Sequence, residues 1–106
     1  MFEKHPRIRI QKHLDAANGL SCVRCTREDG TVVFAHYSGL YSHRFGKGTA
    51  NKVHDICGAD LCMECHGYFD HYKAGNDADR AAEFMSYCFA TLARRFEKRQ
   101  MGWIGK

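Results

Sequence analysis

Metal-binding side chains are concentrated in one short stretch of the chain, from Cys62 to Asp70. Cys62 and Cys65 form a C-x-x-C knuckle, a spacing in which one short turn directs two sulfur atoms at a single tetrahedral metal ion. His66 and Asp70 are four residues apart, so on a helix they lie on one face, one turn from each other. The spacing therefore predicts two different sites, one built on thiolates and one built on an imidazole and a carboxylate.

A second C-x-x-C knuckle, Cys22 and Cys25, completes a set of four sulfur ligands. The knuckles are separated by 36 residues, so the chain between them must loop out. Four sulfurs around one structural Zn²⁺ is the most economical interpretation. The alternatives are unrelated buried cysteines, or three disulfides in a secreted chain. The opening residues lack the apolar segment of a signal peptide, which favours reduced thiols and predicts a cytoplasmic protein.

Two further cysteines, Cys57 and Cys88, stand outside the knuckles. Cys88 falls on the apolar face of a predicted helix, where a free cysteine behaves as a small buried hydrophobe. The same role is expected of Cys57. Its closeness to the second knuckle also keeps a role as a metal ligand open.

Two strands and a helix are predicted to position these residues. Residues 31–35 are rich in β-branched and aromatic side chains and follow an Asp-Gly turn signal, which predicts a strand that delivers His36 at its end. A second strand at about residues 56–61 would pair with it and bring the knuckles together. A helix over residues 64–73 then carries the imidazole and the carboxylate. We therefore expect His36 to face both groups across one small cleft.

The clearest helix is predicted over residues 77–101, because its apolar residues recur at three- and four-residue steps. These residues, which we expect to face the core, are Ala81, Phe84, Met85, Cys88, Phe89, Leu92, Ala93 and Phe96. A short helix is also expected over residues 11–17. We predict a single α+β domain that spans residues 1–106. Its parts are a basic arm (1–13), a core held together by zinc (20–73) that includes an inserted loop (38–52), and the C-terminal amphipathic helix.

Positive charge is concentrated in the arm and in the inserted loop, and the chain has a net charge of +4. The arm carries Arg7 and Arg9, and the loop carries Arg44, Lys47 and Lys52 among glycines and aromatic residues. Such segments suit contact with the sugar-phosphate backbone of DNA. The alternative is a solvated tail and an ordinary surface loop. No apolar run approaches the roughly 20 residues that span a bilayer, so no membrane partner is expected.

Three polar groups in one cleft would suit hydrolysis of a phosphodiester. A divalent ion held by His66 and Asp70, with open coordination positions, would neutralise the scissile phosphate and the leaving oxygen. The neutral imidazole of His36 would take a proton from the attacking water, a role that suits histidine because its pKa lies close to neutral pH. A lone histidine is more often structural, so this prediction depends on the convergence of all three groups.

The combined order of these motifs resembles the HNH or ββα-metal endonuclease superfamily, and is most similar to small phage and prophage nucleases of the YbcO type. The resemblance covers roughly residues 6–72. It rests on the first knuckle, Ala35-His36, the Gly-Lys-Gly of 46–48, Lys52 and Asp55, and the Cys-x-x-Cys-His-x-x-x-Asp run from Cys62 to Asp70. Each motif alone is weak, so the specificity lies in their order.

The resemblance implies a zinc knuckle that holds the fold and an HNH-like ββα-metal finger that cuts DNA with Mg²⁺ or another divalent ion. Carried over by position, His66 and Asp70 would bind that ion. His36 would be either the general base or a metal ligand, and we favour the base. Asp55 or Asn51 is the nearest candidate for the middle Asn of the family.

Two functions of different class follow. The first is a metal-dependent DNA endonuclease (a hydrolase) that acts on duplex or branched DNA in phage or prophage DNA processing or recombination. The alternative is a non-catalytic, zinc-stabilised nucleic-acid-binding module that uses the arm and the loop. A redox-active dithiol protein is a weaker third interpretation, because the knuckles lack the βαβ setting of such proteins. A nuclease that cuts both strands often works as a dimer, so a homodimer stays open.

Overall fold

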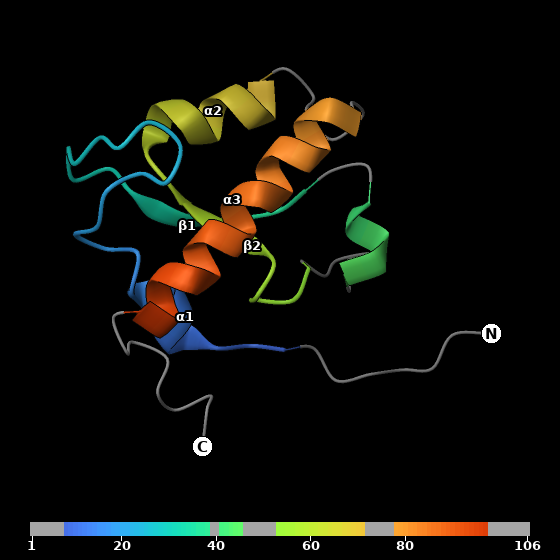
Figure 1. Ribbon diagram of the computed structural model, residues 1–106, viewed down its shortest axis with the longest axis horizontal. Helices are drawn as coiled ribbons and strands as arrows, with labels where there is room; N and C mark the ends of the chain where they lie inside the picture. The colour runs from blue at the N-terminus through green and yellow to red at the C-terminus, as the bar shows by residue number, and fades with distance from the viewer. Residues whose placement is uncertain (1–7, 39–40, 46–52, 72–77, 98–106) are drawn as a thin grey trace.

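The computed structural model describes residues 8–38, 41–45, 53–71 and 78–97 of the chain. Its elements, in chain order, are helix α1 (Gln11–Asp15), strand β1 (Val33–His36), the 3₁₀ turn η1 (Ser42–Phe45), strand β2 (Gly58–Leu61), helix α2 (Met63–His71) and helix α3 (Ala78–Glu97) (Figure 1). This small mixed fold confirms the combination of helices and strands predicted from the sequence. Most of the predicted arm, most of the inserted loop and the end of the predicted C-terminal helix lie outside the described residues.

Strands β1 and β2 pair antiparallel, with Val33 opposite Leu61 and His36 opposite Gly58. The predicted pairing of the two strands is therefore confirmed. Strand β1 begins two residues later than expected, because the backbone amide of Thr31 donates to a side-chain oxygen of the preceding turn, at 2.9 Å, instead of joining the ladder. The strand pair places the cysteine knuckles at one end of the sheet and His36 at the other.

Glycine at position 58 is required by close packing of the two strands. A Cβ atom at Gly58 would overlap the ring of Phe34 and lie 2.7 Å from the carbonyl oxygen of Ala35. Gly19 and Gly30 have a different role, because both adopt positive φ (83° and 82°) in the turns predicted after the first helix and before the first strand. Glycine thus fixes both the turns and the closest approach within the sheet.

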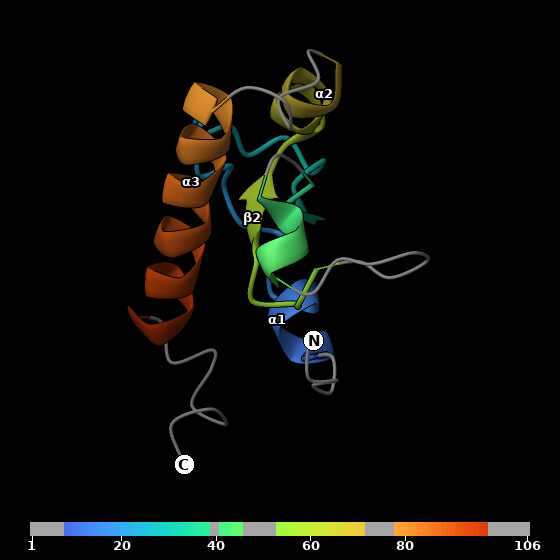
Figure 2. The same ribbon diagram turned by 90° about the vertical axis from the view of Figure 1, so that its right-hand side faces the viewer.

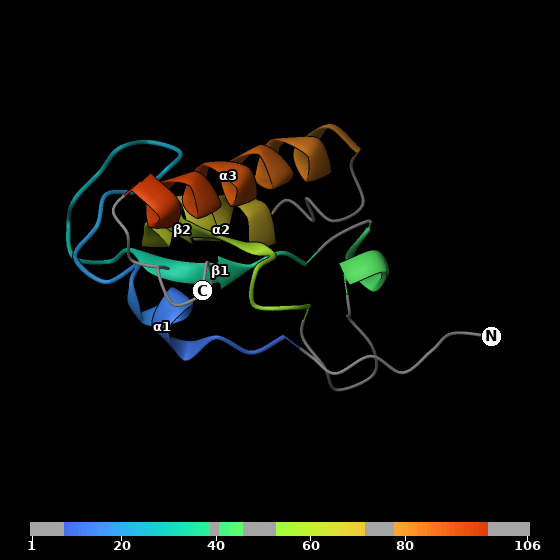
Figure 3. The same cartoon turned by 60° about the horizontal axis from the view of Figure 1, so that its bottom comes forward.

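Helices cover both faces of the sheet. Helix α3 crosses one face and α1 lies on the other, as Figures 2 and 3 show from two directions. On the α3 side, Phe84 makes edge-to-face contacts with Tyr37 and Phe69, at centroid distances of 5.4 and 4.8 Å. On the α1 side, the ring of His13 packs against Phe34 at 4.5 Å. The aromatic core therefore links β1 and the residue that follows it to all three helices.

A buried ion pair fastens α3 to β2. Two nitrogens of Arg95 donate to the carboxylate oxygens of Asp60 at 2.6 and 2.7 Å, and both side chains are fully buried. Arg95 also donates to the carbonyl oxygen of His13 at 3.0 Å, and the amide of Asp60 donates to the hydroxyl of Thr91 at 3.1 Å. Buried charges are tolerated when they are paired and hydrogen-bonded in this way. The sequence pattern did not predict this pair.

The buried face of α3 differs from the predicted one. Phe84 and Cys88 are buried as expected, but Phe89 and Phe96 are 72% and 56% exposed. The prediction that these two phenylalanines belong to the core is therefore wrong. The ion pair explains the difference, because it turns Arg95 toward the sheet and leaves the next residue, Phe96, on the outside.

Candidate metal centre and adjoining histidine pocket

The four knuckle cysteines gather at one end of the sheet. The sulfur atoms of Cys22, Cys25, Cys62 and Cys65 all lie within 4.8 Å of one another. Across residues 8–38, 41–45, 53–71 and 78–97, this is the only group of three or more Cys, His, Asp or Glu ligand atoms so arranged. All four are free thiols. Four sulfurs in this arrangement could bind a metal ion such as zinc, as the two knuckles predicted.

Backbone hydrogen bonds hold the first knuckle in place. The amide of Thr26 donates to the carbonyl of Cys22 at 2.9 Å and closes the turn, in which Thr26 adopts a φ of 66°. The amide of Val23 donates to the carbonyl of Asp60 at 2.9 Å. Because Asp60 lies two residues before the second knuckle, this bond fixes one knuckle against the other. The long separation of the knuckles in sequence is thus bridged by β-strand pairing.

The thiols of the cluster differ in acidity. Burial raises the pKa of Cys65 to about 12 and also raises that of Cys62. Burial acts in the same direction on Cys22, but backbone hydrogen bonds outweigh it and lower the pKa of that thiol to about 7. Metals bind thiolates, so loading of this cluster releases protons.

Arg24, between the cysteines of the first knuckle, makes a contact that sequence reasoning missed. Its Nη1 donates to the sulfur of Cys65 at 3.5 Å, and its Nε donates to Glu83 at 3.0 Å. The guanidinium also lies over the ring of Tyr68, 4.1 Å from the centroid. A positive donor beside thiolates offsets their charge and orients them toward a metal. An arginine inside a C-x-x-C turn could have signalled this role.

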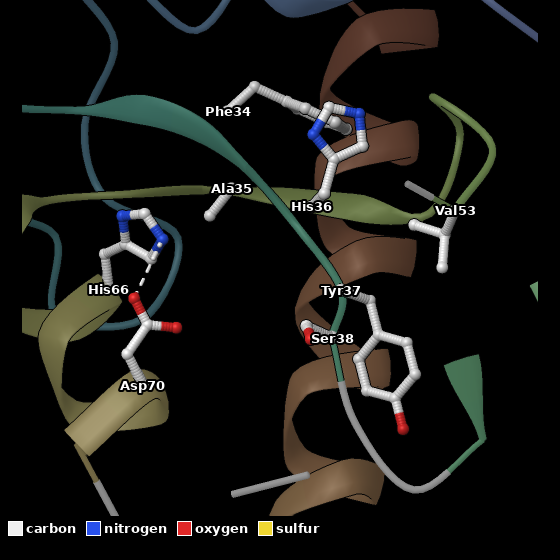
Figure 4. A pocket seen from close by; sticks show the side chains of 8 residues that line it. All are labelled: Phe34, Ala35, His36, Tyr37, Ser38, Val53, His66 and Asp70. Carbon is white, nitrogen blue, oxygen red and sulfur yellow. Dashed lines mark ion pairs between the residues drawn. The ribbon is translucent and has the colours of Figure 1, made fainter. Parts of the chain in front are cut away.

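A pocket with a volume of about 310 Å³ adjoins the metal centre, since Cys65 and His66 are neighbours in the chain. Figure 4 shows the residues that line it: Phe34, Ala35, His36, Tyr37, Ser38, Val53, His66 and Asp70. The three groups predicted to share one cleft, His36, His66 and Asp70, therefore do line the same hollow. The hairpin-then-helix argument predicted this proximity.

The three groups nevertheless point in different directions. His36 extends from β1 away from His66 and Asp70 (Figure 4). Alternate residues of a strand share a face, so His36 lies on the side of Phe34, with ring centroids 5.2 Å apart. The expectation that His36 faces the two helix groups is therefore wrong in direction, although its location in the pocket is right. The direction differs because successive side chains of a strand point to opposite faces of the sheet.

His36 pairs instead with a buried carboxylate. Its Nε2 lies 2.9 Å from Oδ1 of Asp55, which is 3% exposed. The other oxygen of Asp55 accepts the backbone amide of Ile10 at 2.6 Å, and Arg9 approaches the carboxylate at 3.7 Å. A carboxylate in this position fixes the orientation of the imidazole, and it leaves Nδ1 as the basic nitrogen when Nε2 carries the proton. The predicted site residue Asp55 is thus joined to His36.

His66 and Asp70 form a second pair on the surface of α2. His66 Nε2 and Asp70 Oδ2 are 3.4 Å apart, and their side chains are 41% and 68% exposed. The spacing of four residues places them on one face of the helix, as predicted. An imidazole and a carboxylate in this arrangement offer two donor atoms to a metal ion or to a hydrogen-bonding ligand.

Only part of the predicted nucleic-acid surface is described. Arg9 and Arg44 are exposed, and Arg44 stacks over the ring of Tyr41 at 4.9 Å. Arg9 donates to the carbonyl of Val53 at 3.1 Å, beside the pocket. Arg7, Lys47 and Lys52, which the sequence also assigned to this surface, lie outside the described residues, as does Asn51.

The remaining cysteines stand apart from the metal centre. Cys57 is half-buried and is not a member of the four-sulfur cluster, so the structure gives no support to a ligand role for it. Cys88 is buried on α3, and burial raises the pKa of its thiol to about 12. The expectation that Cys88 acts as a small buried hydrophobe is confirmed.

Comparison of the chain with family models, with curated proteins and with solved structures finds no match in any of the three. Within the described residues, no helix has both the length and the apolar character needed to cross a membrane. The inferences about function therefore rest on the cysteine cluster and on the pocket beside it.

Proposed function

We propose that this protein is a divalent-metal-dependent DNA endonuclease of the HNH type, stabilised by a structural Zn²⁺ at its four cysteines. The proposal is carried by one observation: a histidine held by a buried carboxylate and an imidazole-carboxylate pair on α2 line the same pocket beside the metal centre. An ordinary structural zinc module has no use for this second set of polar groups. The resemblance in motif order adds support from the sequence.

In this proposal the dyad of His36 and Asp55 handles the proton. His36 accepts a proton from the attacking water, and Asp55 holds the ring in position and stabilises the imidazolium that forms. The buried position of Asp55 and its hydrogen bond from the amide of Ile10 hold the carboxylate in place for this role. Asp55 therefore acts through His36 as a positioning residue.

His66 and Asp70 are the proposed ligands of the second ion. Mg²⁺ commonly uses one or two carboxylates and completes its coordination with water and phosphate oxygens, so an exposed imidazole and carboxylate 3.4 Å apart fit an ion of this open kind. When bound, such an ion supplies neutralisation of the phosphate and of the leaving oxygen. Arg9 and Arg44 provide exposed positive charge for the DNA backbone.

A second candidate is a zinc-stabilised module that binds nucleic acid without cutting it. One observation favours it: in the described parts of the chain, no third ligand atom joins His66 and Asp70 within 4.8 Å, and His36 points to the other side of β1. The two candidates share the zinc ion and the basic surface. They differ in whether the pocket performs chemistry.

Cleavage assays on supercoiled plasmid and on branched DNA, with Mg²⁺, Mn²⁺ or EDTA, distinguish the two. We expect cutting by the wild type only with a divalent ion, and losses of about 10²- to 10⁴-fold in His36→Ala, Asp55→Asn and His66→Ala. Asp15→Asn is the matched control for Asp55→Asn, because Asp15 is an exposed carboxylate on α1 outside the pocket. Zinc content is measured for every protein, so that loss of the fold is not mistaken for loss of catalysis.

Two results would contradict the proposal. If the wild type and His66→Ala bind DNA equally and neither cuts any substrate with any metal, the non-catalytic module is the correct function. If Asp55→Asn cuts as fast as Asp15→Asn, the dyad has no role in proton transfer.

A further inference from the structure

We infer that the outer face of α3 docks against the same face of a second copy of this chain. The outer face comprises five exposed residues with alternating steps of four and three: Ala82, Ser86, Phe89, Ala93 and Phe96. This is the spacing of a heptad seam, by which two helices pack along their length. The inference does not depend on the proposed nuclease activity.

The outer face is separate from the face that α3 uses within its own chain. Figures 2 and 3 show α3 at the edge of the molecule, with the sheet on one side only. Phe89 and Phe96 are seven residues apart, so they lie two turns from each other on the same side of the helix. Both rings are more than half exposed. Large apolar side chains aligned in this way mark an interaction site more often than scattered ones do.

A hollow for an incoming side chain lies directly beside the seam. It has a volume of about 460 Å³ and is lined by Leu20, Ser21, Ala90, Ala93, Arg94 and Glu97. The last four of these residues follow the pattern i, i+3, i+4, i+7, the diamond on a helix surface that receives a side chain from a facing helix. The lining mixes apolar side chains with Ser21, Arg94 and Glu97, and the volume exceeds the roughly 150 Å³ of a cavity that holds benzene, so the hollow has room for a phenyl ring.

The exposed phenylalanine rings and the hollow both lie on the outer side of α3, which favours a second copy of this chain as the partner. A surface that carries both its own protruding residue and its own receiving site is self-complementary, which is the property of a two-fold symmetric interface. In an antiparallel pair, Phe89 would lie against Ala93 of the second copy and Phe96 against Ser86, so each ring meets a small side chain. The opposed helix dipoles also favour this direction.

The expected dimer is weak and leaves the pocket accessible. A helix of 20 residues is about 30 Å long, so a single helix pair falls in the small, transient class of interfaces. The residues that line the histidine pocket come from β1, α2 and the chain beside them, and none belongs to α3. Association through α3 therefore does not require the pocket to close.

Sedimentation of the full chain from about 1 µM to about 1 mM tests the inference, because weak interfaces dissociate in this range. We expect the average mass to rise from monomer to dimer with concentration. Phe89→Glu and Phe96→Glu should each weaken association at least about tenfold, because a hydrated carboxylate would replace an apolar ring at the seam. Met63→Glu is the matched control, since Met63 is 71% exposed, lies off the seam and receives the same change.

A photo-crosslinking benzoylphenylalanine in place of Phe89 identifies what covers the face. In mixtures of isotope-labelled and unlabelled protein, we expect crosslinks between copies to residues of α3 near Ala93. Crosslinks only within a copy, to residues 98–106, would show that the chain covers its own helix and would overturn the inference. A wild type that stays monomeric throughout, or a dimer that Phe89→Glu and Met63→Glu leave equally intact, would also overturn it.

Discussion

The two ends of the β1–β2 sheet present their polar side chains in different ways. At the cysteine end, four sulfurs face one another within 4.8 Å. At the histidine end, the polar groups form two separate pairs, His36 with Asp55 and His66 with Asp70, and His36, His66 and Asp70 line one pocket. One end is arranged around a common centre, and the other is not.

The difference comes from how each set of ligands is supplied. Each C-x-x-C knuckle provides two ligands through local geometry, so a single long-range relation, the pairing of β1 with β2, completes the set of four. The histidine pocket needs residues from three separate segments, and a shift of one residue in a strand sends a side chain to the opposite face. A site that is built from repeated local motifs therefore tolerates more variation in the surrounding fold.

The largest expected effect breaks the cysteine end. Cys62→Ser removes one of four ligands, and we expect loss of bound zinc and of cooperative thermal unfolding, because structural zinc supplies much of the folding free energy in small domains. Zinc content by mass spectrometry and melting by circular dichroism measure this. Cys57→Ser is the control, since Cys57 lies outside the cluster. Equal zinc content and equal melting temperatures of the two variants would show that the four-cysteine cluster does not stabilise the fold through a metal ion.

The next largest effect concerns the buried ion pair between Arg95 of α3 and Asp60 of β2, the strand that runs between the two ends of the sheet. Arg95→Met removes the two shortest ion-pair contacts of the buried Asp60 and leaves it one longer contact, to Arg94 at 3.2 Å, so we expect a loss of about 3 kcal/mol in the free energy of unfolding by urea. Arg27→Met breaks an exposed pair with Glu64 and should cost far less, because water screens exposed ion pairs. Adding Asp60→Leu to Arg95→Met should restore part of the loss. Similar losses for the Arg95 and Arg27 variants would contradict the role of burial.

The smallest expected effect is the acid sensitivity that comes from His13 of α1, whose ring packs against Phe34 of the strand that carries His36. Burial, followed by the nearby Arg95, lowers the pKa of His13 from 6.5 to about 4. Between pH 6.5 and 4, His13 therefore binds a proton in the unfolded chain but not in the folded protein. As the pH falls through this range, this residue lowers the free energy of unfolding. His13→Phe keeps the ring contact with Phe34 and removes the titration, so we expect a shallower decline of unfolding free energy over that range.

His43→Phe, at an exposed histidine, controls for the substitution itself. Protonation of the cysteines contributes to the pH dependence of every variant, so the difference between His13→Phe and the wild type isolates His13. Parallel curves for these two proteins would exclude His13 as a source of acid sensitivity.

Much of the local structure could be predicted from the sequence alone. The knuckles, the two paired strands, the helix that carries His66 and Asp70, and the long C-terminal helix all follow from spacing, periodicity and turn residues. Each element depends on residues within a few positions of one another, and the pairing of the two strands was expected because it brings the two knuckles together. The sequence therefore determined the four-sulfur cluster, the i, i+4 pair on α2 and the approximate bounds of the elements.

The tertiary structure alone decided which groups became partners. Asp55 meets His36 because the chain after the loop returns beside β1, and Arg95 is buried because Asp60 lies beneath α3. The helical period permitted more than one buried face of α3, and the buried ion pair selected the one that leaves Phe89 outside. Such choices depend on contacts between residues 19 to 35 positions apart, which no local pattern encodes.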